Sequence, residues 1–100
     1  MPKISLSVPH NLGQDDAVER IKGFMPRVRD HYQGQVKDIE ESWDGNTLSF
    51  GFRTMGMTIQ GQIVVEQSEA NVEAELPFAA IAFKGMIEKS LRDNLTKLLA

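Results

Sequence analysis

Few residues in this sequence have the types and spacing that catalysis or metal binding requires. The two histidines, His10 and His31, form no His-x-x-x-His or Glu-x-x-His pair with which a zinc site could begin. We expect His10 to make structural contacts just before a helix, and His31 to interact with the dipole near that helix's end. The chain has no cysteine, which excludes a cysteine nucleophile, a thiolate metal site and a disulfide scaffold.

The carboxylates are poorly placed for acid–base chemistry. Glu40 and Glu41 are neighbours on an expected strand, so their side chains point to opposite faces. Asp15 and Asp16 fall in the first turn of an expected helix, where the helix dipole favours negative charge. Serine, histidine and aspartate are all present, so counting alone leaves a catalytic triad open, but the Gly-x-Ser-x-Gly elbow and the glycine-rich phosphate loops are missing. We therefore predict a non-enzyme with no catalytic residue, metal ligand or cofactor.

The run of apolar residues at 78–83 is the first feature that suggests binding. Phe78, Ile81 and Phe83 lie in it, and Met86 follows closely. One interpretation is core contact where a sheet passes into a helix. The other is an exposed apolar patch that contacts a partner or a hydrophobic surface.

The methionines suggest a second binding feature. Met25, Met57 and Met86, together with Ile59, could line a site for an apolar ligand between a sheet and its covering helices. Methionine adapts to irregular space, which suits such a lining. The alternative is ordinary core packing, because 100 residues leave little volume for a pocket.

Length and composition indicate one globular domain. The 100 residues are 41% hydrophobic and 25% charged, as in ordinary globular chains. The net charge of −3 disfavours a nucleic-acid partner. The longest apolar run has six residues, whereas a spanning helix needs about 20, so we expect a cytoplasmic protein without a transmembrane segment.

The first third of the chain predicts a strand followed by helix. Apolar residues alternate with serines over residues 4–8, which is typical of a half-buried strand. Asn11 and Gln14 have the spacing of a capping box, and an apolar stripe then continues to Tyr32. Pro26 interrupts this stripe, so we expect either a kink within residues 23–26 or two short helices.

The middle of the chain predicts four more strands. Alternating apolar residues indicate strands near residues 36–43, 48–53, 57–65 and 72–76, separated by turn residues. If Phe52 pairs with Met57 across a tight turn, Phe50 meets Ile59 and Leu48 meets Gly61. The apolar side chains then share one face, and polar side chains occupy the other.

The last segment predicts a helix over residues 84–99, with its start left open between residues 77 and 84. Phe83, Ile87, Leu91 and Leu95 form its apolar stripe. We therefore predict a single α+β domain over residues 1–100 with the order β-α-β-β-β-β-α. Its antiparallel sheet, a four-strand meander plus the N-terminal strand, would carry two helices packed on one face.

The order of several short motifs resembles the bacterial polyhydroxyalkanoic acid system family across nearly the whole chain. These motifs are Pro2-Lys3-Ile4, Pro9-His10-x-Leu12-Gly13, Trp43-x-Gly45-x-x-Leu48-x-Phe50, Gly61-x-Ile63-x-Val65, Val72-x-Ala74-x-Leu76-Pro77 and Phe83-Lys84-Gly85-x-Ile87-Glu88. The resemblance implies a small accessory protein, encoded with genes of polyhydroxyalkanoate metabolism and in some members placed at the storage-granule surface. It transfers no catalytic residue.

Three functional hypotheses follow. The first is a non-enzymatic accessory protein that contacts the granule surface or granule proteins through Phe78, Ile81, Phe83 and Met86. The second is a small carrier that holds an apolar ligand between sheet and helices. The third is a structural homodimer joined through an edge strand or the last helix.

Overall fold

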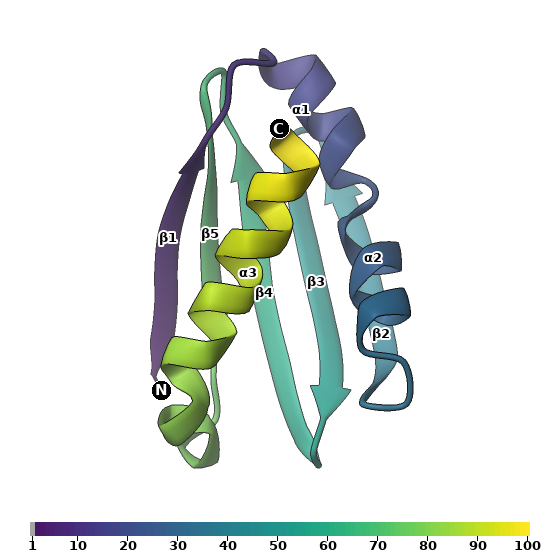
Figure 1. Ribbon diagram of the computed structural model, residues 1–100, viewed down its shortest axis with the longest axis vertical. Helices are drawn as coiled ribbons and strands as arrows, with labels where there is room; N and C mark the ends of the chain where they lie inside the picture. Colours follow the sequence, from purple (N-terminus) through teal and green to yellow (C-terminus); the bar gives the residue numbers. More distant parts are fainter. Residues whose placement is uncertain (1) are drawn as a thin grey trace.

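Five antiparallel strands form one sheet in the order β1-β5-β4-β3-β2 in the computed structural model, which describes residues 2–100 (Figure 1). The strands are β1 (Lys3–Pro9), β2 (Val36–Asp44), β3 (Thr47–Thr54), β4 (Met57–Val65) and β5 (Glu69–Glu75). Strands β2 to β5 follow one another as a meander, and β1 pairs with β5 at the far edge. The predicted α+β class and the meander are therefore confirmed.

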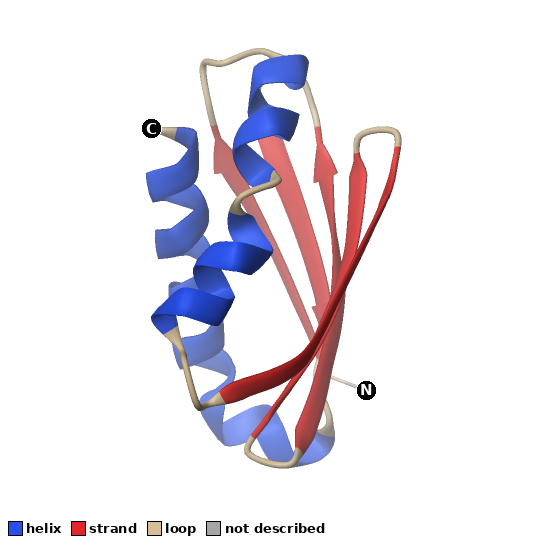
Figure 2. Ribbon diagram, turned by 90° about the vertical axis from the view of Figure 1, so that its right-hand side faces the viewer, coloured by secondary structure: helices blue, strands red, loops and turns tan. Residues whose placement is uncertain are grey.

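The helices cover one face of this sheet. They are α1 (Gln14–Ile21), α2 (Phe24–His31) and α3 (Lys84–Leu99), and the 3₁₀-helix η1 (Phe78–Phe83) leads directly into α3. In Figure 2, α1, α2 and α3 lie on the same side of the strands, η1 passes below the lower ends of the strands, and the other sheet face is open. The α1–α2 segment carries the chain from β1 to β2, which are the two edges of the sheet.

The first helical segment is two helices, one of the two alternatives that Pro26 left open. The break falls at Lys22 and Gly23, and α2 begins at Phe24. Pro26 is thus the third residue of α2. An N–H at this position has no partner within a helix, so proline removes no hydrogen bond here.

The capping box at the start of α1 is a wrong prediction. Gly13 precedes the helix with a φ of 78°, and no side chain caps the helix start. The Gln14 Nε2 instead donates to the Val65 carbonyl oxygen, 3.0 Å away, and so ties α1 to the end of β4.

The predicted register of the β3–β4 hairpin is also wrong, by two residues. Phe52 pairs with Ile59, Phe50 with Gly61, and Leu48 with Ile63. The turn is the two-residue Met55-Gly56, so the strands run further than expected before reversing. A shift of two residues leaves every side chain on its predicted face, because the strand repeat is also two.

The core lies between the inner sheet face and the helices. Ile4, Leu48, Ile63 and Val72 from the sheet are buried there against residues such as Leu95 from α3. Gly61 allows a close approach in this layer: a Cβ on Gly61 would lie 2.8 Å from Phe50 Cζ and 2.6 Å from the Glu73 carbonyl oxygen. Only glycine therefore fits at this position.

Candidate functional site

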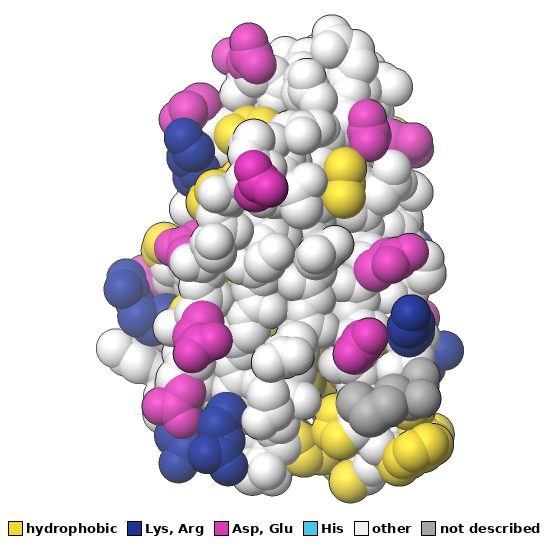
Figure 3. All heavy atoms as spheres, turned by 180° about the vertical axis from the view of Figure 1, so that it is seen from behind, with side chains coloured by type: hydrophobic (Ala, Val, Ile, Leu, Met, Phe, Trp, Pro, Cys, Tyr) yellow, Lys and Arg dark blue, Asp and Glu magenta, His cyan; other side chains and the backbone are white. Residues whose placement is uncertain are grey.

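Five large hydrophobic side chains are exposed at one end of the molecule, which we call the apolar end. They are Met55, Phe78, Ile81, Phe83 and Met86. Phe78 is 70% exposed, Met55 66% and Met86 60%, values far from those of core residues. Figure 3 shows hydrophobic side chains gathered at the lower end, whereas the face above them is mostly polar and acidic. The interpretation of Phe78 and Ile81 as core contacts is therefore wrong.

The geometry of η1 explains why this apolar run faces solvent. A 3₁₀-helix repeats every three residues, so Phe78 and Ile81 lie above one another on one face. Ala80 points inward and is fully buried, which fixes η1 against the body of the protein. Phe83 and Met86, again three apart, continue the exposed surface into the first turn of α3.

Met55 reaches the apolar end from the β3–β4 turn, which lies beside η1. Gly56 and Met57 border the same surface hollow as Pro77 and Ala79. Met55 has a φ of 52° and Gly56 a φ of 74°. Methionine is an unfavourable choice in this left-handed region, where asparagine and glycine are common. An exposed, strained methionine contributes nothing to core packing, so its side chain is a candidate contact residue.

A groove of about 460 Å³ opens beside the apolar end, between α2, α3 and the strands β3 and β4. Of the residues predicted to line a ligand site, Met57, Ile59 and Met86 border the groove. Met25 does not: it is 1% exposed and lies in the core. The other apolar lining residues are Phe24, Val28, Val36, Phe52, Met55, Phe83, Ile87 and Leu91.

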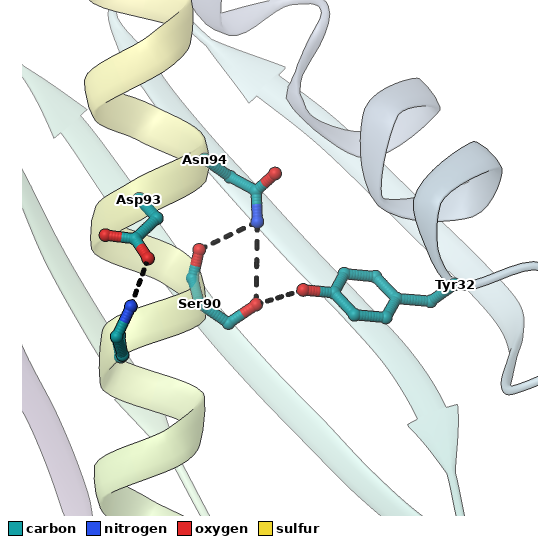
Figure 4. A network of polar contacts seen from close by, with 5 residues as sticks. Tyr32, Ser90, Asp93 and Asn94 are labelled. Carbon is teal, nitrogen blue, oxygen red and sulfur yellow. Dashed lines mark hydrogen bonds and ion pairs between the residues drawn. The ribbon is translucent and has the colours of Figure 1, made fainter.

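One wall of the groove is polar, a feature that sequence reasoning missed. The Tyr32 hydroxyl, at the end of α2, shares a hydrogen bond with the Ser90 hydroxyl of α3 (Figure 4). Asn94 Nδ2 donates to the Ser90 carbonyl oxygen at 2.7 Å and approaches Ser90 Oγ at 3.5 Å. Arg27 Nε donates to Asn94 Oδ1 at 2.8 Å. The sequence signal for this wall was the four-residue spacing of Ser90 and Asn94, which places two polar side chains next to each other along α3.

An ion pair stands at the rim of the groove. Lys89 Nζ lies 2.8 Å from Asp93 Oδ2, and both residues border the groove. The hydrogen bond from Lys89 lowers the pKa of the Asp93 carboxyl below its ordinary value, and its charge adds to the effect. The same hydrogen bond raises the pKa of Lys89. The pair contributes no net charge to the groove mouth.

The residues weighed for catalysis lie elsewhere. His10 is 5% exposed, its Nδ1 accepts a hydrogen bond from the Leu12 N–H at 3.2 Å, and its Nε2 lies 3.1 Å from the Glu66 carbonyl oxygen. Both ring nitrogens are therefore engaged in hydrogen bonds with backbone groups. His31 lies in the last turn of α2, beside the Tyr32 ring. Within residues 2–100, no three His, Cys, Asp or Glu side chains are grouped to hold a metal ion.

The open face of the sheet carries a wider hollow of about 690 Å³. Its lining is largely polar and includes Glu40, Glu73 and Glu75. This is the solvated face that the strand alternation predicts. None of the helices in residues 2–100 has both the length and the apolar character to cross a bilayer.

The fold and the site define a small α+β domain with helices on one sheet face, a groove beneath them and an apolar end. The chain belongs to the family described as "Putative polyhydroxyalkanoic acid system protein", whose model matches residues 4–99. This match confirms the family resemblance. No protein of curated function matches the chain.

Of two similar solved structures, DynU16 alone supports the fold, and it supports nothing beyond the fold. DynU16, a protein of the dynemicin biosynthetic locus, superposes with a TM-score of 0.67 at 15% identity, covering 97% of this chain and 46% of that one. The chain therefore spans about half of DynU16. Norcoclaurine synthase from Thalictrum flavum superposes with a TM-score of 0.45 at 14% identity, over 97% of this chain and 85% of that one. These likenesses carry no functional conclusion.

Proposed function

We propose that this protein is a non-enzymatic accessory protein of the polyhydroxyalkanoate system, and that its apolar end binds the surface of the storage granule. Membership of the family supports the assignment to the polyhydroxyalkanoate system. The observation that carries the proposal is the exposure of Phe78 and Ile81 in η1, next to Phe83 and Met86, which border one groove together with Met55.

The physical case rests on what these side chains gain from a hydrophobic surface. Phe78, Ile81 and Met86 are each more than half exposed, so the free protein leaves much of their apolar area in water. Transfer of apolar area out of water is favourable by about 25 cal/mol per Å². The polar and acidic side chains of the open sheet face stay hydrated when the end alone is in contact (Figure 3).

The proposed role is binding and includes no catalytic step. His10, the residue best placed to be a buried base, is engaged at both ring nitrogens by backbone groups of its own loop and of the β4–β5 turn. Its arrangement serves the fold.

Co-sedimentation with granules tests the proposal. We expect the wild-type protein to sediment with granules stripped of their native proteins, and a variant carrying both Phe78→Ser and Ile81→Ser to stay in the supernatant. The matched control is Val18→Ser on α1, the same kind of change away from the apolar end, which should sediment like the wild type. Equal sedimentation of all three proteins, or binding only to unstripped granules, would contradict a direct surface contact. Light scattering on the same samples detects the third hypothesis, self-association.

A further inference from the structure

The groove between α2, α3 and the strands β3 and β4 has the features of a small-molecule site that adjoins the granule contact. Its volume of about 460 Å³ falls in the range of about 300–1,000 Å³ typical of ligand pockets. Val28 supplies an apolar wall from α2, Phe52 one from β3, and Ile87 one from α3. Phe52 and Ile87 are only partly buried, so they present apolar surface to whatever enters.

Donor chemistry fixes the direction of the hydrogen bonds in the polar wall from Arg27 as far as Ser90. Arg27 can only donate, so Asn94 accepts through Oδ1, and its amide nitrogen is oriented to donate toward Ser90. The Ser90 and Tyr32 hydroxyls share one hydrogen bond in which either can donate, and the arrangement relevant to a ligand is the one in which Ser90 donates to Tyr32 Oη. The hydroxyl hydrogen of Tyr32 is then left to donate at the groove. A ligand with an acceptor oxygen completes the chain in this arrangement.

The rim adds a second condition, on charge. Lys89 is paired with Asp93 at 2.8 Å, and the two charges cancel at the groove mouth. An anionic head group would face Asp93 as well as Lys89, so a charged ligand gains little there, while it loses hydration on approaching the apolar walls. A neutral polar group meets no such cost.

From these conditions we propose that the groove binds a single alkyl chain carrying a neutral ester, whose carbonyl oxygen accepts a hydrogen bond from the Tyr32 hydroxyl. The alkyl chain lies against the walls formed by Val28, Phe52 and Ile87. The two contacts adjoin, because Met55, Phe83 and Met86 of the apolar end also border the groove. Phe78 and Ile81 do not border it, so changes at these two residues separate the two contacts.

The methionines provide the readout. Met57 and Met86 border the groove, whereas Met25 is buried in the core, so Met25 is an internal control. In protein labelled with ¹³C at the methionine methyl groups, titration with methyl decanoate should shift the resonances of Met57 and Met86 and leave that of Met25 unchanged. Decanoate, the anion of the same chain length, should bind more weakly. No shift at Met57 and Met86, or tighter binding of decanoate, would overturn the proposal.

Tyr32→Phe tests the polar contact, because it keeps the ring and removes only the hydroxyl. We expect a loss of about 3- to 10-fold in affinity for methyl decanoate, the usual weight of one hydrogen bond. Should that variant fold poorly, Ser90→Ala breaks the same donor chain one step earlier and should show a similar loss. Unchanged affinity in the folded variant would contradict the assignment.

The Phe78→Ser, Ile81→Ser variant separates this proposal from the granule contact. It should bind methyl decanoate as the wild type does while failing to sediment with granules. Loss of ester binding in this variant would show that the two sites are one and would overturn the separate groove site. If the wild-type protein binds methyl decanoate but does not sediment with granules, only the proposed granule contact is contradicted.

Discussion

The end of the molecule that holds the β4–β5 turn uses its side chains to bind backbone, whereas the apolar end turns large side chains to solvent. At this polar end, Gln14 and Asn46 both donate to the Val65 carbonyl oxygen, at 3.0 and 2.7 Å. His10 holds the Glu66 carbonyl, and Arg20 Nη1 donates to the Leu98 carbonyl at 3.2 Å. Polar side chains therefore provide hydrogen-bond donors for the backbone carbonyl groups at the ends of strands and helices there.

At the apolar end, the corresponding turn and helix start have no side chain bound to backbone in this way. The start of η1 and the start of α3 lack a side-chain cap, and the β3–β4 turn holds a methionine in the left-handed region. The contrast indicates that side chains at the polar end stabilise the fold, whereas the uncapped helix starts and the strained Met55 at the apolar end lower its stability. Such a cost is typical of a surface that serves binding.

The largest effect should come from His10→Ala. The change removes a buried ring and opens a void, and it leaves the part-buried Glu66 carbonyl and Leu12 N–H without their partner. We expect the free energy of unfolding to fall by about 2 to 3 kcal/mol, measured by chemical denaturation. The folded fraction should still bind granules. A stability change below about 0.5 kcal/mol would mean that the polar end does not stabilise the fold as described.

The shared acceptor at Val65 predicts a non-additive pair. Gln14→Ala or Asn46→Ala alone leaves the Val65 carbonyl with one donor, so each should cost about 0.5 to 1 kcal/mol. The double variant removes both donors from a buried residue, and we expect it to cost about 1 kcal/mol more than the sum. Denaturation of the four proteins measures this coupling, and simple additivity would show that the two bonds act independently.

Met55→Asn should raise stability and lower granule binding together. Asparagine tolerates the left-handed backbone at this turn, so the free energy of unfolding should rise by about 0.5 to 1 kcal/mol. The matched control is Met86→Asn, the same exchange within α3, which should weaken granule binding without any gain in stability. A stabilised Met55→Asn protein that binds granules normally would remove Met55 from the contact surface.

The smallest effect concerns the groove rim. The Asp93 carboxyl should titrate at a pH below its ordinary value, because Lys89 stabilises its charged form. With a lowered pKa in the folded state, its contribution to stability is present above the unfolded pKa of about 3.9 and is lost as the pH falls through the folded pKa. An NMR titration measures it. Lys89→Met should return the midpoint toward the ordinary value, and an unchanged midpoint would contradict the pairing.

Alternation and helical stripes predicted most of the fold, and the errors show what such patterns lack. The alternation of Leu48, Phe50 and Phe52 fixed their face but not their partners, because pairings two residues apart bury the same side chains. Only the two-residue turn at Met55-Gly56 selects the register. Likewise, Asn11 had the composition of a cap, but the chain passes into α1 through Gly13.

The candidate site was less accessible to sequence reasoning. The apolar run at 78–83 predicted both a core segment and an exposed patch, and the 3₁₀ geometry, which hydropathy does not encode, decides its exposure. Met25 and Met57 have the same side chain, yet α2 turns Met25 into the core while the β3–β4 hairpin leaves Met57 at the groove. Tyr32 and Ser90 meet across 58 positions in the sequence, which no local pattern reveals.

Methionine oxidation on granules tests the central claim most directly, because it reports which end makes the contact. In the free protein, mild peroxide should convert the exposed Met55 and Met86 to sulfoxides and spare the buried Met25. On granules, the account predicts that Met55 and Met86 become protected while Met25 is unchanged, as read by mass spectrometry of the peptides. Oxidation of Met55 and Met86 at the same rate in the free and granule-bound protein would contradict it.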